Sequence, residues 1–353
     1  MITLKDIAKR CDVSPSTVSN ILNGKTNVSE ATKKKVLDAI KESGYQPNYF
    51  AQGMRKQKTN IIGIIVEEID NFSSPGVIEG IMAYCENKGY RTILENMRMY
   101  DRWRNAWWEE NVKEYHDILK LAMREMSSIK VDGIIYVAGH ARVIDCFPED
   151  FEAPAVMAYG YSGSKKYPSV VIDDEKGSYD MTKYLISMGH RKIGVICGCP
   201  DNIHSQKRCL GYQKALFGEK ILYNPEWIRY GDWYRKSASI ETENLIREGV
   251  TAIFCFNDQM AGGVYDYLED HQMKAGKDIA VVGYDNQEFT NYFRPQITTM
   301  EIAVREIGNK AAEILLDIID DKYDWDMNPK NEIEIPGRLI ERASVNRIQP
   351  NLD

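Results

Sequence analysis

The sequence lacks any apolar run near the roughly 18 residues that a membrane-spanning helix needs, and it lacks an N-terminal apolar stretch with a basic flank. We therefore expect a cytoplasmic protein without a signal peptide. Its seven cysteines form an odd and scattered set, which fits a reducing compartment. Cys197 and Cys199 have no histidine at ligand spacing, so we interpret them as small buried hydrophobes and expect no metal site.

Enzyme motifs are also missing. No phosphate-cradling glycine motif follows a strand pattern, and the five histidines have no evident serine or cysteine partner. The sequence therefore predicts neither an enzyme nor a protein with a cofactor.

The first 22 residues contain two short helical patterns joined by a tight turn. Apolar residues recur at i, i+3, i+4 and i+7 from Leu4 to Cys11, and Thr3 can cap this helix. A second helix is predicted to begin at Pro15 after a Ser14 cap. Its expected buried face is Val18, Ile21 and Leu22. Its expected outward face is Ser16, Thr17, Ser19 and Asn20, short polar side chains that suit a groove.

A third helix is predicted between a Ser29 cap and Gly44, with Val36, Leu37 and Ile40 in the core. Three helices in about fifty residues is the size of a helix-turn-helix module, although periodicity alone also fits another small bundle. Charge favours the first interpretation. Residues 1–60 contain eleven Lys and Arg against five acids, a net charge of +6, which leaves −13 for the rest of a chain whose total is −7. A basic head on an acidic body is typical of a nucleic-acid-binding arm.

Several runs in this head resemble the DNA-binding domain of the lactose repressor (LacI/GalR) family of bacterial transcription regulators. These runs are Leu4-Lys5-Asp6-Ile7-Ala8, Val13-Ser14-x-x-Thr17-Val18-Ser19, Leu22-Asn23-Gly24, Val28-Ser29 and Gly44-Tyr45-x-Pro47-Asn48. The resemblance implies operator DNA as a partner. It assigns DNA contacts to Thr3, Ser14, Pro15, Ser16, Thr17, Ser19, Asn20, Asn27, Tyr45 and Met54.

Two of these positions give specific expectations. Family members commonly have Arg where this chain has Asn20, and Asn pairs with adenine where Arg prefers guanine, so we expect adenine at that operator step. Residues 47–60 resemble the family's hinge helix, which orders on DNA, and Met54 would be the apolar wedge in the minor groove. A simple flexible linker is the alternative.

Beyond residue 60 the sequence predicts an α/β body. Short apolar strands are expected at 61–66, 91–95, 133–137, 155–158, 170–172, 193–197, 252–255 and 279–282, and a helix begun by Pro75 is expected to bury Val77, Ile78, Ile81, Met82 and Cys85. Such alternation indicates parallel sheets covered on both faces, and the number of strands indicates two doubly wound lobes with a ligand cleft at the strand ends. The resemblance to the lactose repressor family implies the architecture of periplasmic sugar-binding proteins for this body. The expected domains are a head at 1–46, a hinge at 47–60, a first lobe at 61–160 and 300–330, a second lobe at 161–299 and 331–345, and a tail at 346–353.

The family resemblance continues through the body. It rests on Asp173-Asp174-x-x-Gly177, Gly189-His190-Arg191-Lys192-Ile193, Arg208-x-x-Gly211-Tyr212, Asn257-Asp258-x-Met260-Ala261 and Val282-Gly283-Tyr284-Asp285. It implies an effector site formed by Phe72, Tyr159, Arg208, Trp233, Asn257 and Asp285. A guanidinium, an aromatic ring, an amide and a carboxylate suit a sugar, but they also suit a purine. Considered one at a time, each residue has an ordinary structural interpretation. Arg208 could belong to a surface ion pair, Trp233 could pack in the core, and Asp285 could be a turn residue.

Three features depart from the family pattern. Tyr159 aligns with an acidic sugar-binding position. Glu67 and Glu68 follow the first strand, and we interpret them as solvated charges. The segment 89–132 is long and rich in aromatic residues, namely Tyr100, Trp103, Trp107, Trp108 and Tyr115. Our hypothesis is that this segment forms a lid over a larger saccharide. A locally packed helix or a dimer contact is an equally good interpretation.

We therefore expect a homodimeric regulator, most simply a repressor, whose operator affinity depends on a small ligand. The alternative within the family is a purine or protein effector. A different class, a sugar-binding transport or signalling protein without a DNA role, would share the body and lack the head.

Overall fold

The computed structural model describes residues 2–22, 28–45, 58–103, 111–147, 151–326 and 330–348. The chain divides into two compact units, Met1–Asn60 and Ile61–Asp353. In the described parts of both units, no helix is long and apolar enough to cross a membrane.

The first unit contains the three predicted helices, α1 (Leu4–Cys11), α2 (Pro15–Leu22) and α3 (Glu30–Ser43). Their predicted caps are confirmed. The Thr3 hydroxyl accepts from the Asp6 amide at 3.3 Å, and the Thr3 amide donates to the Asp6 carboxylate at 2.8 Å, which forms a capping box. Ser14 Oγ accepts from the Thr17 amide at 3.1 Å, and Ser29 caps α3 in the same way.

The core of this unit lies between the three helices and includes Ile7, Val18 and Val36. The prediction that Leu37 lies in this core is wrong. Leu37 is 43% exposed, and Ala39 is buried in the core instead. The period of α3 places Val36 and Ala39 on the face that packs against α1 and α2, and it turns Leu37 toward solvent.

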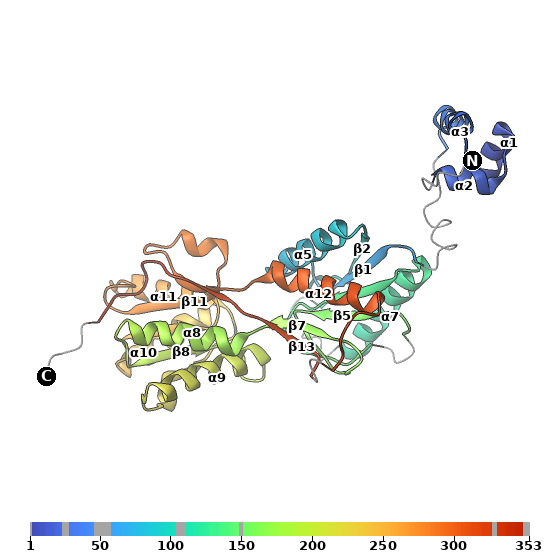
Figure 1. Ribbon diagram of the computed structural model, residues 1–353. Helices are drawn as coiled ribbons and strands as arrows, with labels where there is room; N and C mark the ends of the chain where they lie inside the picture. The colour runs from blue at the N-terminus through green and yellow to red at the C-terminus, as the bar shows by residue number, and fades with distance from the viewer. Residues whose placement is uncertain are drawn as a thin grey trace. The chain divides into compact units, whose positions relative to one another are not determined.

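The second unit contains two six-stranded sheets (Figure 1). The first sheet is entirely parallel. Its strands in spatial order are β13 (Glu332–Ile335), β7 (Ser169–Ile172), β5 (Ala155–Ala158), β3 (Gly133–Val137), β1 (Ile61–Val66) and β2 (Arg91–Asn96). Its helices are α5 (Ser74–Asn87), α6 (Met99–Trp103), α7 (Val112–Ile129) and α12 (Val304–Ile319).

Alternate residues of β1 enter different cores. Ile62 and Ile64 pack with residues of α5 and α12, whereas Ile61 and Ile65 pack with residues of α7. The first sheet is therefore covered on both faces, which is why β1 is apolar throughout. Met82 of α5, expected inside, is 39% exposed.

The second sheet has one antiparallel strand, β14, at its edge. Its strands in spatial order are β14 (Arg338–Ile340), β12 (Thr298–Glu301), β11 (Ala280–Asp285), β10 (Ala252–Cys255), β8 (Ile193–Cys197) and β9 (Ile228–Tyr230). Its helices are α8 (Asp174–Ser187), α9 (Ile203–Gly218), α10 (Arg235–Arg247) and α11 (Asp258–Asp270). Helix α8 packs against α9, and α10 packs against α11. Two short strands, β4 (Val143–Ile144) and β6 (Tyr161–Ser162), pair separately.

Strand pairing corrects the expected lobe boundaries. Strands β7 and β13 pair with each other in the first sheet, although the sequence placed both in the second lobe. Strand β12 pairs in the second sheet through Glu301, which is beyond the expected boundary at 299. The chain therefore passes between lobes at 172–174, 301–304 and 335–338, and these boundaries depend on long-range pairing that local patterns do not encode.

Candidate functional site

The helix-turn-helix unit presents α2 as a polar surface. Ser14, Pro15, Ser16 and Asn20 are exposed, and Thr17 and Ser19 are half-buried. Ser14 Oγ also lies 2.6 Å from Ser16 Oγ, so the cap and the outward face share a hydrogen-bonding chain. The structure thus places the predicted recognition residues together on one helix.

The other predicted DNA contacts lie around this helix or outside the described residues. Thr3 is exposed at the start of α1, and Tyr45 is half-buried against the core of the head. Asn27 and Met54 fall outside the residues that the structure describes, as does 47–57 of the expected hinge.

In the second unit, Arg208 lies at the centre of a buried ionic cluster. Its Nε donates to Asp174 Oδ1 at 2.7 Å, and its Nη1 donates to the Phe256 carbonyl and lies 3.8 Å from Asp285 Oδ1. Its guanidinium also stacks 3.6 Å from the centroid of the Tyr284 ring. We call Asp174, His204, Arg208, Tyr284 and Asp285 the Arg208 cluster.

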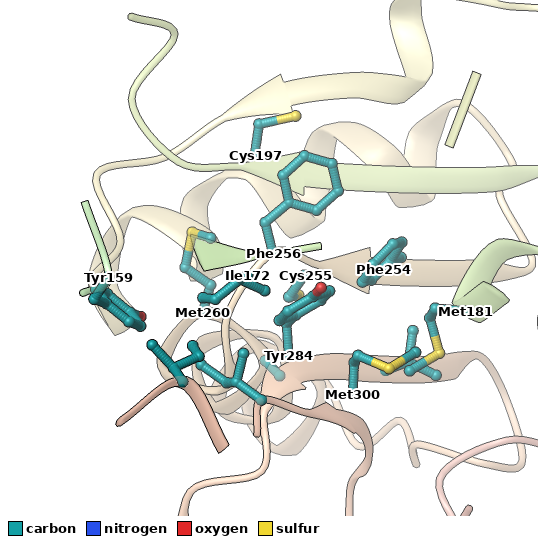
Figure 2. Close-up of a cluster of buried hydrophobic side chains, with 14 of the residues drawn as sticks. Tyr159, Ile172, Met181, Cys197, Phe254, Cys255, Phe256, Met260, Tyr284 and Met300 are labelled. Atoms are coloured by element: carbon teal, nitrogen blue, oxygen red, sulfur yellow. The ribbon is translucent and has the colours of Figure 1, made fainter. Parts of the chain in front are cut away.

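The fold explains why these side chains meet. Asp174 begins α8, His204 and Arg208 lie on α9, and Tyr284 and Asp285 end β11. They gather at the carboxyl ends of the strands, which is where open α/β sheets bind ligands. The Tyr284 ring packs against buried apolar side chains of the second sheet (Figure 2). One of these is Phe254, whose ring centroid lies 6.4 Å from that of Tyr284.

The two carboxyl groups that face Arg208 have different electrostatics. Burial alone would raise the pKa of Asp174, but His204 and Arg208 hold it below its ordinary value. His204 Nδ1 lies 2.6 Å from Asp174 Oδ2. Burial raises the pKa of Asp285 to about 7, with Arg208 opposing the shift. At neutral pH the site therefore offers one fixed carboxylate and one carboxyl group that exchanges its proton readily.

Three predicted effector residues have left-handed backbone conformations. The φ angles are 67° at Tyr159, 73° at Trp233 and 109° at Asp285. Non-glycine residues adopt such angles at a cost of about 1–3 kcal/mol, and this strain concentrates at ligand sites. Tyr159 directly follows β5, Asp285 ends β11, and Trp233 lies three residues after β9.

Trp233 is fixed from two sides. Its indole lies flat on Gly198, where a Cβ would come within 2.0 Å of the ring. Its carbonyl accepts from Asn257 Nδ2 at 2.9 Å, while Asn257 Oδ1 caps α11 through the Met260 amide at 2.8 Å. The Trp233 ring centroid lies 6.0 Å from the Arg208 guanidinium carbon.

The structure thus brings together five of the six predicted effector residues. Arg208 and Asp285 form the ionic centre, Trp233 lies beside it, and Asn257 supports Trp233. Tyr159 reaches the cluster from the first lobe, with its ring centroid 5.7 Å from that of His204. Phe72 is 45% exposed in the loop before α5, and none of the contacts described above includes it.

Sequence reasoning missed Asp174, His204 and Tyr284 as members of the site. Asp174 and Tyr284 belong to the motifs quoted above, but a carboxylate before a helix is also an ordinary N-terminal residue. Only the fold shows that Asp174 faces Arg208 and that His204 faces Asp174.

Glu67 and Glu68 are not solvated charges, because each is only 5% exposed. Glu67 pairs with the Arg142 guanidinium through both carboxylate oxygens and accepts from the Gly139 amide at 2.6 Å. The Tyr136 hydroxyl also donates to it. Burial would raise the pKa of Glu67, but Arg142 holds it below its ordinary value. A loop 75 residues away in sequence supplies the cation, which explains the wrong interpretation.

The aromatic-rich segment is partly described. Tyr100 and Trp103 lie on α6, and Tyr115 on α7 is 2% exposed in the core of the first lobe. The Tyr100 hydroxyl hydrogen-bonds His140 Nε2, and Trp103 Nε1 donates to Glu114 at 3.0 Å. Trp107 and Trp108 lie outside the described residues.

The fold and these two sites define a class of protein, a DNA-binding transcription regulator with a ligand-binding body. Two family comparisons agree. The bacterial regulatory proteins of the lacI family match residues 3–48, and the periplasmic binding protein-like domain matches residues 182–345.

Similarity extends over nearly the whole chain. The chain is 30% identical to the HTH-type transcriptional repressor PurR of Vibrio campbellii, over 99% of the chain and 100% of that protein. It is 32% identical to PurR of Vibrio atlanticus, over 98% of the chain. The chain belongs to the lacI family of transcription regulators, and both of these relatives are named as transcriptional repressors.

Two solved structures resemble the fold. The lac repressor dimer bound to operator and the anti-inducer ONPF has a TM-score of 0.78 at 24% identity, over 98% of this chain and 99% of that one. The transcriptional regulator CelR in complex with cellobiose has a TM-score of 0.65 at 25% identity, over 98% and 100%.

Proposed function

We propose that this regulator is a repressor that works as a homodimer in the cytoplasm and that an uncharged sugar at the Arg208 cluster controls its affinity for operator DNA. The charge balance of the cluster supports the sugar. Arg208 is already paired with Asp174, and Asp285 adds a second carboxyl group. A phosphate or carboxylate effector would meet two acidic groups, whereas sugar hydroxyls can donate to the carboxyl oxygens.

The aromatic residues agree with this proposal. Trp233 offers an apolar ring beside the ionic centre, and a sugar ring can pack its C–H face on such a surface. The strained backbone at Tyr159, Trp233 and Asp285 is a second support, since strain at three positions around one cluster fits a prepared binding site.

A purine is the second candidate. The Vibrio relatives carry the name PurR, and Trp233 or Tyr159 could stack on a nucleobase. A purine would need hydrogen-bond partners on its edges, which Asp285 and the Asn257 amide could supply. A protein effector remains the third possibility within the family.

Control of DNA binding would follow from linkage. The ligand can shift operator affinity only by its differential affinity for two arrangements of the lobes. The three crossings at 172–174, 301–304 and 335–338 are the segments that would absorb such a rearrangement.

A ligand screen tests the proposal. Thermal melting of the full chain would be followed with monosaccharides, disaccharides, amino sugars, sugar phosphates and purines, because a ligand at 100 times its dissociation constant adds about 2.7 kcal/mol of stability. We expect a neutral sugar to raise the melting temperature and to change operator binding measured by fluorescence anisotropy. The shift should disappear in Trp233→Ala, which leaves the buried ion pair intact. A shift with hypoxanthine or guanine alone would transfer the assignment to a purine.

A further inference from the structure

Three side chains that commonly bind metal ions gather on the surface of the first lobe, and none of them belongs to the Arg208 cluster. His116 lies on α7, and Asp145 and Cys146 directly follow β4. Their donor atoms, an imidazole nitrogen, a carboxylate oxygen and a thiol sulfur, all lie within 4.8 Å of one another. His116 and Asp145 are exposed, and Cys146 is half-buried. We call these three residues the His116 triad.

The two segments that carry the triad are anchored on one buried residue, Tyr136 of β3. Tyr115 precedes His116, and its hydroxyl lies 2.6 Å from that of Tyr136. Phe147 follows Cys146, and its ring meets the Tyr136 ring edge-on, with the centroids 5.5 Å apart. All three aromatic side chains are buried. Because each anchor is next in sequence to a member of the triad, the core holds the two backbones at a fixed separation.

The backbone before Asp145 is held from a second side. Ile144 pairs with Ser162 in the β4–β6 sheet, and the Gly163 amide donates to the Ile144 carbonyl at 2.8 Å. Gly163 packs so closely that a Cβ at this position would lie 3.1 Å from the Asp145 Cα. A ligand that bound the triad would therefore have to order side chains and very little backbone, which lowers the entropic cost of binding.

The two exposed donors are not engaged by other side chains. Among the residues that the structure describes, no hydrogen bond or ion pair involves the His116 ring or the Asp145 carboxylate. The His116 ring instead lies beside the buried Tyr115 ring, with the centroids 5.9 Å apart. The lone pairs of both donors are therefore available to a ligand.

The donor set indicates which ion would bind. A thiolate and an imidazole are ligands of Zn²⁺ and related transition metal ions, whereas Mg²⁺ and Ca²⁺ require shells of oxygen atoms. Zn²⁺ binds such donors at about 2.0–2.3 Å, so the donor atoms of a tetrahedral site lie roughly 3.3–3.8 Å apart. Rotation of the exposed His116 and Asp145 side chains can close the triad to this spacing. Three protein ligands leave the fourth tetrahedral position to water.

We propose that the His116 triad is a Zn²⁺ site that joins α7 to the segment after β4. Local spacing did not predict it, because His116 and Asp145 are far apart in the sequence and meet only through the fold. The site lies within the first lobe, so it goes beyond the proposed effector function and does not depend on it.

Metal titration tests the site directly. The full chain, without a histidine tag, would be kept reduced, freed of metal with a chelator and titrated with Zn²⁺ in competition with a chromogenic indicator. We expect one Zn²⁺ per chain, which excess Mg²⁺ does not displace. His116→Gln, Asp145→Asn and Cys146→Ser should each weaken Zn²⁺ binding by more than about tenfold, the smallest loss typical of removing a partner that only supports a ligand.

Co²⁺ gives a spectroscopic test of the same ligands. Bound to the native chain, Co²⁺ should show a thiolate-to-metal charge-transfer absorption, and Cys146→Ser should lack it. Cys199, a half-buried thiol of the second lobe, provides the matched control, because Cys199→Ser should bind both ions as the native chain does. Zn²⁺ should also raise the melting temperature of the native chain and of Cys199→Ser, but not that of the triad variants.

Several results would overturn the site. They are a native chain that binds no Zn²⁺, triad variants that bind it as tightly as the native chain, and a loss of binding in Cys146→Ser alone. Melting temperature and operator binding without metal would show which variants are folded. If Cys146→Ser did not fold, His116→Gln and Asp145→Asn would decide, because both positions are exposed.

Discussion

Arg208 donates from Nε to Asp174 Oδ1 at 2.7 Å, and the two side chains expose only 3% and 1% of their surfaces. Removal of one partner from such a pair leaves an uncompensated buried charge. The same carboxylate orients His204, so it connects the guanidinium to the ring that meets Tyr159 of the first lobe.

Asp174→Ala should therefore lower the free energy of unfolding by about 3–5 kcal/mol. The neighbouring Glu175 provides the control, because its ion pair with Lys214 is 37% and 54% exposed. Glu175→Ala should cost less than about 1 kcal/mol. Urea unfolding of both variants measures the difference, and equal effects would contradict a structural role for the buried pair.

Asp285 should make stability depend on pH. Burial raises its pKa from 3.8 to about 7, so between these values the folded state holds a proton that the unfolded state releases. The stability that this proton contributes is fully present below the unfolded pKa and is lost as the pH rises through the folded pKa. Between pH 5 and 8, the native chain should lose more unfolding free energy than Asp285→Asn, which is isosteric and does not titrate. Parallel pH profiles of the two proteins would refute this assignment.

Asn257 has two separable roles, and one substitution distinguishes them. Asn257→Asp keeps an oxygen to cap α11 but loses the Nδ2–H donor to the Trp233 carbonyl. We expect the melting temperature to change little and effector affinity to fall roughly fivefold, about 1 kcal/mol. Titration with the ligand found in the screen measures the affinity. Unchanged stability together with unchanged affinity would show that Asn257 acts only as a cap.

Much of the fold could be predicted because its signals are local. The Thr3, Ser14 and Ser29 caps are determined by neighbours three residues away, and apolar runs such as 61–66 are unambiguous. The sequence could not show to which lobe β7 and β13 belong. A short buried parallel strand has the same apolar sequence pattern in either sheet.

The site was predictable only where a family motif contained its residue. Arg208, Asn257 and Asp285 were found in this way, and the structure places Arg208 beside Asp285. The burial of Glu67 depends on Arg142, which approaches only through the loop after β3. A charged residue that follows a strand is most often exposed to solvent. The local sequence around Glu67 therefore favours a solvated side chain, which is the wrong environment.

Asn20 should set base preference in the operator. It is exposed on α2, and Asn pairs through two hydrogen bonds with adenine, whereas Arg pairs with guanine. Selection from a random DNA library should return adenine at the matching step for the native chain and guanine for Asn20→Arg. Each choice should be worth about 1–3 kcal/mol of discrimination. Guanine selected by both proteins would show that Asn20 does not read this step.

The three crossings between lobes have a consequence for synthesis on the ribosome. The first lobe begins at Ile61, but its covering helix α12 and its edge strand β13 come from 304–335, near the end of the chain. Domains usually fold as their residues emerge, N-terminal first. The first lobe therefore cannot be completed until almost all of the second lobe has emerged from the ribosome. Until then, one edge of its apolar sheet remains uncovered. We therefore expect the two lobes to be completed late and together, and a nascent chain stopped before residue 304 to depend on chaperones.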